Sequence, residues 1–158
     1  MLTHSLTLSL RYGGLLGGDG CIYGIPQNAG SVIKIDPRTD ACSTIGSLEE
    51  GGWKWHGGNT AGDGNIYAIP CHADSVLKID CSAAAVAAGA QVSTIGAGKV
   101  PAGRARPDGK YKYLGGVLGP DGCVYAMPSD VSSPKKESLE INKSPNMDGF
   151  HICAVRLI

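Results

Sequence analysis

Three polar side chains occur at the same distance behind a proline, and their types could bind a metal ion. Asn28, His72 and Asp130 each stand two residues after a proline that follows a short apolar segment. Amide and carboxylate oxygens are ligands that calcium prefers in proteins, and histidine is a common ligand of other metals. Asn and Asp also occur in turns for purely local reasons, so ordinary turns are the alternative interpretation. If the three segments meet in space, the side chains form one polar ring that could hold calcium; apart from this ion, no cofactor is expected.

Two lysines and two tryptophans form a second group of candidate binding residues. Lys54 and Lys112 precede Gly-Gly doublets, where they could direct positive charge towards an anionic ligand; solvated strand ends are the alternative. Trp53 and Trp55 flank Lys54, and an exposed indole could stack on a sugar ring or a peptide side chain. Alternation along a strand would place both indoles on one face, which favours burial of one of them.

Motifs of the common enzyme classes are absent from the sequence. It contains no G-x-S-x-G, no Walker sequence and no H-E-x-x-H. The six cysteines include no C-x-x-C pair, so a zinc ribbon is not predicted, and we expect most of them to be reduced and buried. Leu alternates with Thr and Ser near the N-terminus, which is typical of a strand and not of a signal peptide. The compartment remains unknown, and these features favour an intracellular one.

Composition limits the classes of partner. The 158 residues include 14 Lys and Arg and 14 Asp and Glu, so the net charge is zero. This balance gives no reason to expect nucleic acid or an anionic membrane surface as a partner. No apolar stretch approaches the roughly 18 residues that a membrane helix needs. We therefore expect a protein, a small molecule or a glycan as ligand.

The candidate residues belong to a sequence pattern that occurs three times. Its centre reads D-G-x-[IV]-Y-x-[IM]-P and occupies residues 19–26, 63–70 and 121–128. In the first two copies S-V-x-K-I-D follows, at residues 31–36 and 75–80, and an S-T-I-G segment comes later. Asp-Gly between apolar runs is typical of a hairpin turn because Gly accepts a positive φ, and Pro ends the second strand because it cannot donate to a ladder. Each complete copy predicts four short antiparallel strands.

This unit resembles one blade of a β-propeller. The Gly-Gly doublet and the later Tyr are similar to kelch repeats, and the four-strand unit is similar to the blades of NHL and lactonase-like propellers. No narrower family is identified. The resemblance implies an all-β fold of four-stranded antiparallel propeller-type blades, with about two and a half to three repeats.

The copies divide the chain into an N-terminal strand (1–10), a first blade (11–52), a second blade with loop insertions (53–111) and a partial third blade (112–133). Residues 134–158 depart from the pattern and predict a divergent tail with a possible closing strand. Propellers have about four to eight blades. The chain is therefore predicted to be an incomplete propeller, or to close by oligomerisation, for example as a homodimer.

Propeller blades place the loops between their second and third strands on the same face as the loops between blades. The resemblance therefore implies that one face collects the candidate ligand-binding residues Asn28, Trp53, Lys54, His72, Lys112 and Asp130. The leading prediction is a non-catalytic binding or interaction module, since this needs only a rigid face with variable loops. Three alternatives stay open: a lactonase- or lyase-like enzyme with a metal at the channel mouth, a carbohydrate-binding protein, and a gene fragment without independent function.

Overall fold

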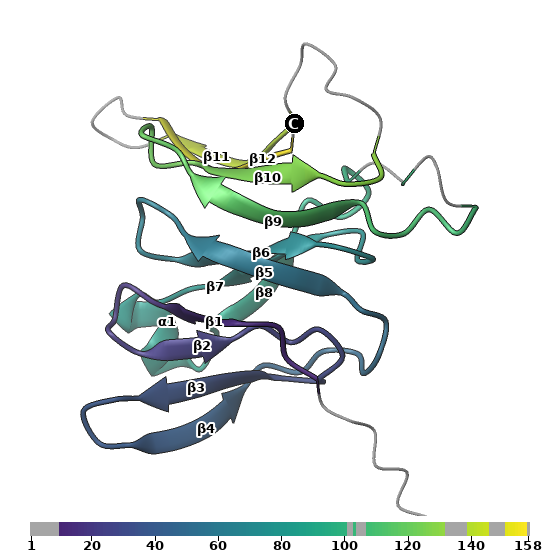
Figure 1. Ribbon diagram of the computed structural model, residues 1–158. Helices are drawn as coiled ribbons and strands as arrows, with labels where there is room; N and C mark the ends of the chain where they lie inside the picture. Colours follow the sequence, from purple (N-terminus) through teal and green to yellow (C-terminus); the bar gives the residue numbers. More distant parts are fainter. Residues whose placement is uncertain (1–9, 101–102, 104–106, 132–138, 146–150, 158) are drawn as a thin grey trace, which may run out of the picture.

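The structure is a computed structural model in which three four-stranded sheets follow one another along the chain (Figure 1). It describes residues 10–100, 103, 107–131, 139–145 and 151–157, the last two segments by their backbone alone. The predicted N-terminal strand thus lies outside the described residues, apart from Leu10, which is not in a strand. The all-β prediction is confirmed, because one short helix is the only helical element in the part of the chain that the structure describes.

Strand order is simple in the first two sheets. The first sheet has the order β1 (Gly14–Leu16), β2 (Ile22–Gly24), β3 (Val32–Asp36) and β4 (Ala41–Ile45). The second has the order β5 (Trp55–Thr60), β6 (Ile66–Pro70), β7 (Val76–Ile79) and β8 (Val92–Ile95). All neighbours in both sheets are antiparallel.

The third sheet is connected differently. It contains β9 (Tyr113–Leu118), β10 (Val124–Pro128), β11 (Leu139–Pro145) and β12 (His151–Leu157), in the order β9-β10-β12-β11. β12 pairs with β10 in parallel, whereas β7 pairs with β6 in antiparallel fashion. The third position of this sheet, next to β10, is therefore occupied by β12 (Figure 1). This strand lies in the segment 134–158, for which we predict a possible closing strand.

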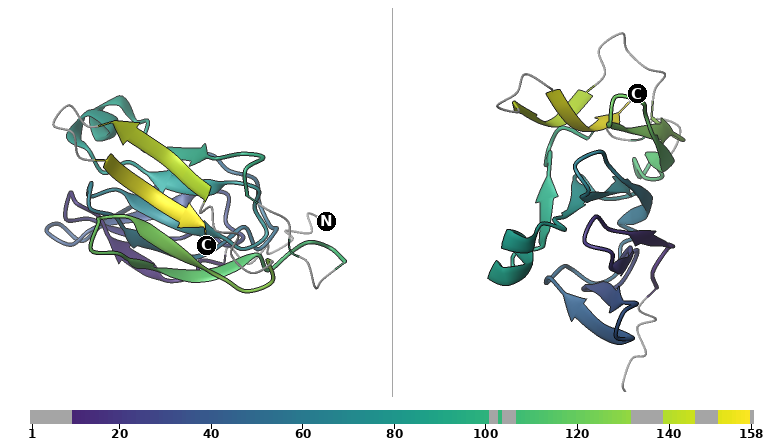
Figure 2. Two further views of the ribbon diagram at one scale, coloured as in Figure 1. Left: turned by 90° about the horizontal axis from the view of Figure 1, so that it is seen from above. Right: turned by 90° about the vertical axis from the view of Figure 1, so that its left-hand side faces the viewer.

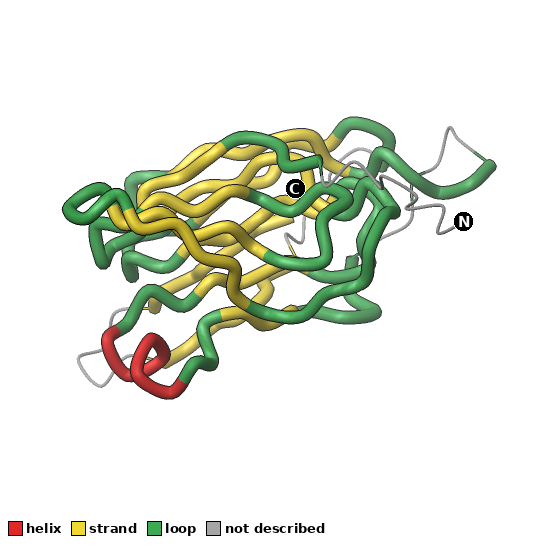
Figure 3. The backbone as a smooth tube through the Cα atoms, turned by 90° about the horizontal axis from the view of Figure 1, so that it is seen from below, coloured by secondary structure: helices red, strands yellow, loops and turns green. Residues whose placement is uncertain are grey.

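The Ala-rich insertion of the second sheet, which we expected to be a loop, contains the helix α1 (Ala83–Ala88). Ser82 caps its start by accepting the N–H of Ala85 at 3.2 Å, and Gly89 ends it with a left-handed φ of 64°. The helix lies at one margin of the strands (Figure 3). It joins β7 to β8 at the outer edge of the second sheet.

Each D-G-x-x-Y sequence forms the same hydrogen-bonded hairpin. The Asp19 carboxylate accepts the N–H of Cys21 at 3.1 Å and the hydroxyl of Tyr23 at 2.7 Å. The same two bonds recur at Asp63 and Asp121, whose carboxylates accept the hydroxyls of Tyr67 and Tyr125 at 2.7 and 2.8 Å. The repeated Asp and Tyr therefore hold the hairpins in shape.

Consecutive hairpins meet through glycines. Gly18 donates its N–H to the carbonyl of Gly64 at 2.9 Å, and Gly62 donates to the carbonyl of Gly122 at 3.0 Å. A Cβ on Gly18 would lie 2.9 Å from the Cα of Gly64, and one on Gly62 would lie 3.0 Å from the Cα of Gly122. Only glycine permits this approach without a shift of backbone, so Gly18 and Gly62 determine how closely the sheets stack (Figure 2).

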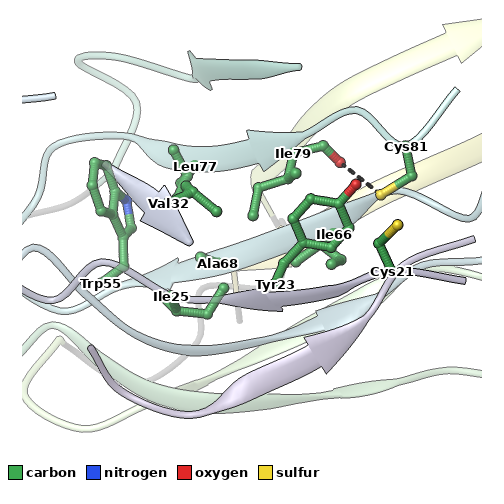
Figure 4. Close-up of a cluster of buried hydrophobic side chains, with 10 residues drawn as sticks. All are labelled: Cys21, Tyr23, Ile25, Val32, Trp55, Ile66, Ala68, Leu77, Ile79 and Cys81. Atoms are coloured by element: carbon green, nitrogen blue, oxygen red, sulfur yellow. Dashed lines mark hydrogen bonds between the residues drawn. The ribbon is translucent and has the colours of Figure 1, made fainter. Parts of the chain in front are cut away.

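Two apolar cores fill the spaces between the sheets. In the first core Tyr23 and Ile25 of the first sheet pack with Trp55, Ile66 and other residues of the second (Figure 4). In the second core Tyr67 and Ile69 pack with residues of the third sheet, and both Tyr23 and Tyr67 are 0% exposed. Burial of these apolar faces stabilises the stacking of one sheet on the next.

Candidate functional site

The loops that carry the predicted ligand-binding residues meet pairwise at one edge of the stack. The N–H of Trp53 donates to the side-chain oxygen of Asn28 at 2.8 Å. The N–H of His72 donates to the carbonyls of Trp53 and Lys54 at 3.3 and 3.2 Å. At the next level the N–H of Asp130 donates to the carbonyl of Lys112 at 3.3 Å. Asn28 thus contacts the loop that enters the next sheet, whereas His72 and Asp130 contact the loop that enters the first strand of their own sheet.

The two lysines join neighbouring sheets. The Lys54 ammonium donates to the carbonyls of Ala29 and Gly51 at 3.3 and 2.9 Å. At the equivalent position the Lys112 ammonium donates to the carbonyl of Ala73 at 3.2 Å and pairs with Asp74. Burial lowers the pKa of Lys54, against the opposing effect of nearby acidic groups. Each lysine therefore hydrogen-bonds the loop between the second and third strands of the preceding sheet.

The two tryptophans have different environments. Trp55 is 3% exposed and its indole donates to the carbonyl of Ser75 at 2.8 Å, whereas Trp53 is 44% exposed. Burial of one indole is confirmed, but the expected strand alternation does not apply to Trp53. This residue precedes β5 and has a left-handed φ of 48°, which turns its side chain out of the strand pattern.

Three rings from three loops form a row, which we call the aromatic row: Trp53, His72 and Tyr111. The Trp53 and His72 rings are stacked with centroids 6.4 Å apart, and Tyr111 meets His72 edge-on at 4.6 Å. Tyr111 also has a left-handed φ, of 57°. Bulky residues seldom adopt this conformation, and such strain is concentrated at functional sites.

Tyr111 is missing from the residues predicted as ligand-binding. Its signal is present in the sequence, because Tyr111-Lys112 stands where Trp53-Lys54 stands one repeat earlier. The length of the loop before Tyr111 obscures this equivalence. The structure makes it plain, since both aromatic residues have a left-handed φ and precede a lysine with the same inter-sheet contacts.

A pocket of about 500 Å³ lies beside the aromatic row and is reached by His72. It opens between the loop that leaves the first sheet and the β6–β7 loop of the second sheet. Hydrogen-bonding side chains line much of it, namely Ser47, Glu49, Lys54, His72, Asp74, Ser75 and Thr94. Carboxylates, hydroxyls and an ammonium group beside the exposed Trp53 ring can bind a polar ligand that has a flat apolar face.

A second pocket, of about 630 Å³, lies between the first sheet and α1. Its charged groups pair with each other, since Lys34 lies 3.1 Å from Asp19 and Arg38 lies 2.7 Å from Asp36. Burial raises the pKa of Asp19, but hydrogen bonds from Tyr23, the Cys21 N–H and Lys34 outweigh it and leave the pKa below its ordinary value. The charged groups of this pocket are therefore already paired within the protein.

The described cysteines that line or adjoin the two pockets are poor nucleophiles. Cys21, Cys71, Cys81 and Cys123 are reduced and buried, and Cys42 is reduced and exposed. Burial raises the pKa of Cys71, which follows β6 beside His72, and burial also raises the pKa of Cys21 and Cys81. A raised pKa keeps a thiol protonated and weakly nucleophilic at neutral pH.

Neither a cluster of metal-ligating side chains nor a membrane-spanning helix occurs within the described residues. No three His, Cys, Asp or Glu side chains among them are grouped so that they could hold a metal ion. No helix in the described segments is long and apolar enough to cross a membrane. Comparison with protein-family models, with curated proteins and with solved structures found no match.

Proposed function

We propose that this protein is a non-catalytic binding module built on three propeller-type blades, with the aromatic row as its binding surface. The observation that carries the proposal is the Trp53 ring, which is 44% exposed, stacked on His72 and fixed in a left-handed backbone conformation. The propeller-type arrangement is supported by the two equivalent glycine contacts between consecutive sheets.

Hydrogen bonds within the protein fix the backbone around Trp53 without a ligand. Asn28 accepts the N–H of Trp53, while the Lys54 ammonium bonds the carbonyl of Gly51 on the other side. Two glycines with positive φ, Gly51 and Gly52, precede the tryptophan and allow the sharp turn. A ring that is already ordered loses little conformational entropy on binding, so this rigidity supports a recognition role.

A glycan is the ligand class that we favour. An indole face suits the C–H face of a sugar ring, and the neighbouring pocket offers the carboxylates of Glu49 and Asp74 and the hydroxyls of Ser75 and Thr94 to sugar hydroxyl groups. A peptide with an aromatic or cationic side chain is the competing class, because such groups also stack on indole.

Glycan-array binding of the full chain tests this proposal. We expect selective binding that is lost in Trp53→Ala and largely kept in Trp53→Phe, because Phe retains a flat ring. Val86→Ala is the matched control, since Val86 is 40% exposed on α1 and lies outside the aromatic row. Glycan binding that Trp53→Ala leaves unchanged would contradict the proposal.

A further inference from the structure

We propose that the two end faces of the stack are complementary halves of one contact, through which a second copy of this chain binds head to tail. Within the described part of the chain, the first and third sheets each pack against one neighbouring sheet, and their outer surfaces are the two end faces. This inference concerns surfaces other than the aromatic row and does not depend on its ligand.

The third sheet exposes the residues that the earlier sheets bury against their successors. Ile25 and Ile69 are 0% exposed beneath the next sheet, whereas Met127, at the equivalent position, is 37% exposed. Val117 is 53% exposed, although the equivalent Leu15 is partly buried against the core that the first and second sheets share. The outer face of the third sheet therefore has the apolar character of a face that packs on a further sheet.

The outer face of the first sheet exposes the residues that the later sheets bury against the sheet before them. Ile66 and Val124 are 0% exposed because the preceding sheet covers them, whereas the equivalent Ile22 is 37% exposed. Leu16, at the end of β1, is 61% exposed. This face therefore has the character of one that receives a preceding sheet.

A second copy is the occupant that fits both faces. The contact would continue, in the same direction, the two sheet-to-sheet contacts that already exist within the chain. Two copies have six sheets, which lies within the roughly four to eight blades of closed propellers, whereas three copies would exceed that range. A pair of copies could thus make the contact twice, and closed symmetry of this kind is the common outcome for homo-oligomers.

Pro120 weakens the proposed contact. It occupies the position of Gly18 and Gly62, which donate their N–H groups to the next hairpin. Proline has no N–H, and its Cβ would meet Gly20 of the second copy where the internal contacts leave 2.9 to 3.0 Å between a Cβ and the glycine Cα. We therefore expect reversible association that depends on concentration, with a wider seam than the contacts within the chain.

Sedimentation velocity of the full chain over a range of concentrations tests the inference, starting from a monomer of 16.2 kDa. We expect a reversible dimer. Pro120→Gly should tighten its dissociation constant by about fivefold or more, because a hydrogen bond is gained and a steric overlap removed. Val117→Lys and Ile22→Lys should each abolish it, while Val86→Lys, on the exposed α1, should leave it unchanged.

A mixture of Val117→Lys and Ile22→Lys tests whether the two copies bind head to tail. In a head-to-tail pair, the variant Val117→Lys keeps an intact first-sheet face and Ile22→Lys keeps an intact third-sheet face. The mixture should therefore recover one contact and part of the association. A dimer that survives in either single variant, or a chain that stays monomeric as both wild type and Pro120→Gly, would overturn the inference. Circular dichroism checks that each variant is folded.

Discussion

Gly18 donates its backbone N–H to the carbonyl oxygen of Gly64 at 2.9 Å, and this bond joins the first hairpin to the second. A methyl group on Gly18 would meet the Cα and the carbonyl oxygen of Gly64, both at 2.9 Å. These neighbours are backbone atoms and can move only if the sheets separate. The closeness of the two glycines therefore makes sheet stacking sensitive to a single carbon atom.

Gly18→Ala should destabilise the protein by about 1–3 kcal/mol, because the added methyl group forces the hairpins apart. Gly14→Ala is the matched control, since the nearest atom to a Cβ there is a flexible Ile22 methyl at an ordinary 3.5 Å. Urea unfolding of both variants measures the difference. Equal losses of stability in the two variants would contradict the importance of the glycine contact.

Lys112→Met should also destabilise the protein, by about 1–3 kcal/mol, because the partly buried carbonyl of Ala73 loses its donor. The Lys112 side chain is 5% exposed, whereas its partner Asp74 is 82% exposed. Asp74→Asn should therefore cost less than about 1 kcal/mol, as surface ion pairs contribute little. If Asp74→Asn cost as much as Lys112→Met in the same unfolding assay, the ion pair and not the inter-sheet bond would be the stabilising interaction.

Trp53→Asn should raise the stability of the protein and at the same time weaken ligand binding. Asn accepts a left-handed conformation more readily than a bulky aromatic residue, so the free energy of unfolding should rise by about 1 kcal/mol. Ligand binding should fall at the same time because the exposed ring is lost. Calorimetric melting and glycan binding, measured on the same preparation, test both parts; a variant that is less stable than wild type would argue against backbone strain at Trp53.

His56 should make stability depend on pH below neutrality. Its ring stacks on Tyr12 with centroids 3.6 Å apart, and burial lowers the pKa of His56 below the ordinary 6.5. The unfolded chain then binds a proton more readily than the folded one, so the stabilising contribution is complete above pH 6.5 and is lost as the pH falls below it. Melting temperatures between pH 8 and pH 5 should decline, and His56→Phe should flatten this decline.

Asp19 should make stability depend on pH in a more acidic range than His56 does. Its folded pKa lies below the ordinary value, so its carboxylate stabilises the fold above about pH 4, and this contribution disappears as the pH falls through the lowered pKa. Asp19→Asn should reduce stability at pH 6 and reduce the further loss between pH 4 and pH 2. A variant with the same acid unfolding curve as wild type would show that other carboxylates dominate that range.

Local sequence was sufficient to predict the hairpins. Asp19-Gly20 determines a turn within a few residues, since Gly20 accepts a φ of 80° and Asp19 bonds a nearby N–H and the Tyr23 hydroxyl. The same chemistry recurs around Asp63 and Asp121, so a pattern in the sequence is repeated as a pattern in space. The resemblance to propeller blades likewise implied that Asn28, Trp53 and His72 lie on one face, and hydrogen bonds connect their loops.

Long-range pairing determined the rest. The parallel pairing of β12 with β10 joins segments far apart in sequence, and no local signal specifies it. The meeting of His72 with Tyr111 is obscured in the sequence by the long loop before Tyr111. The left-handed conformation of Trp53 likewise arises where a loop must connect two stacked sheets. The sequence by itself determined the repeated hairpins, because turn chemistry acts over a few residues. Only the tertiary structure decided which loops meet, because that depends on how whole sheets bury their faces against each other.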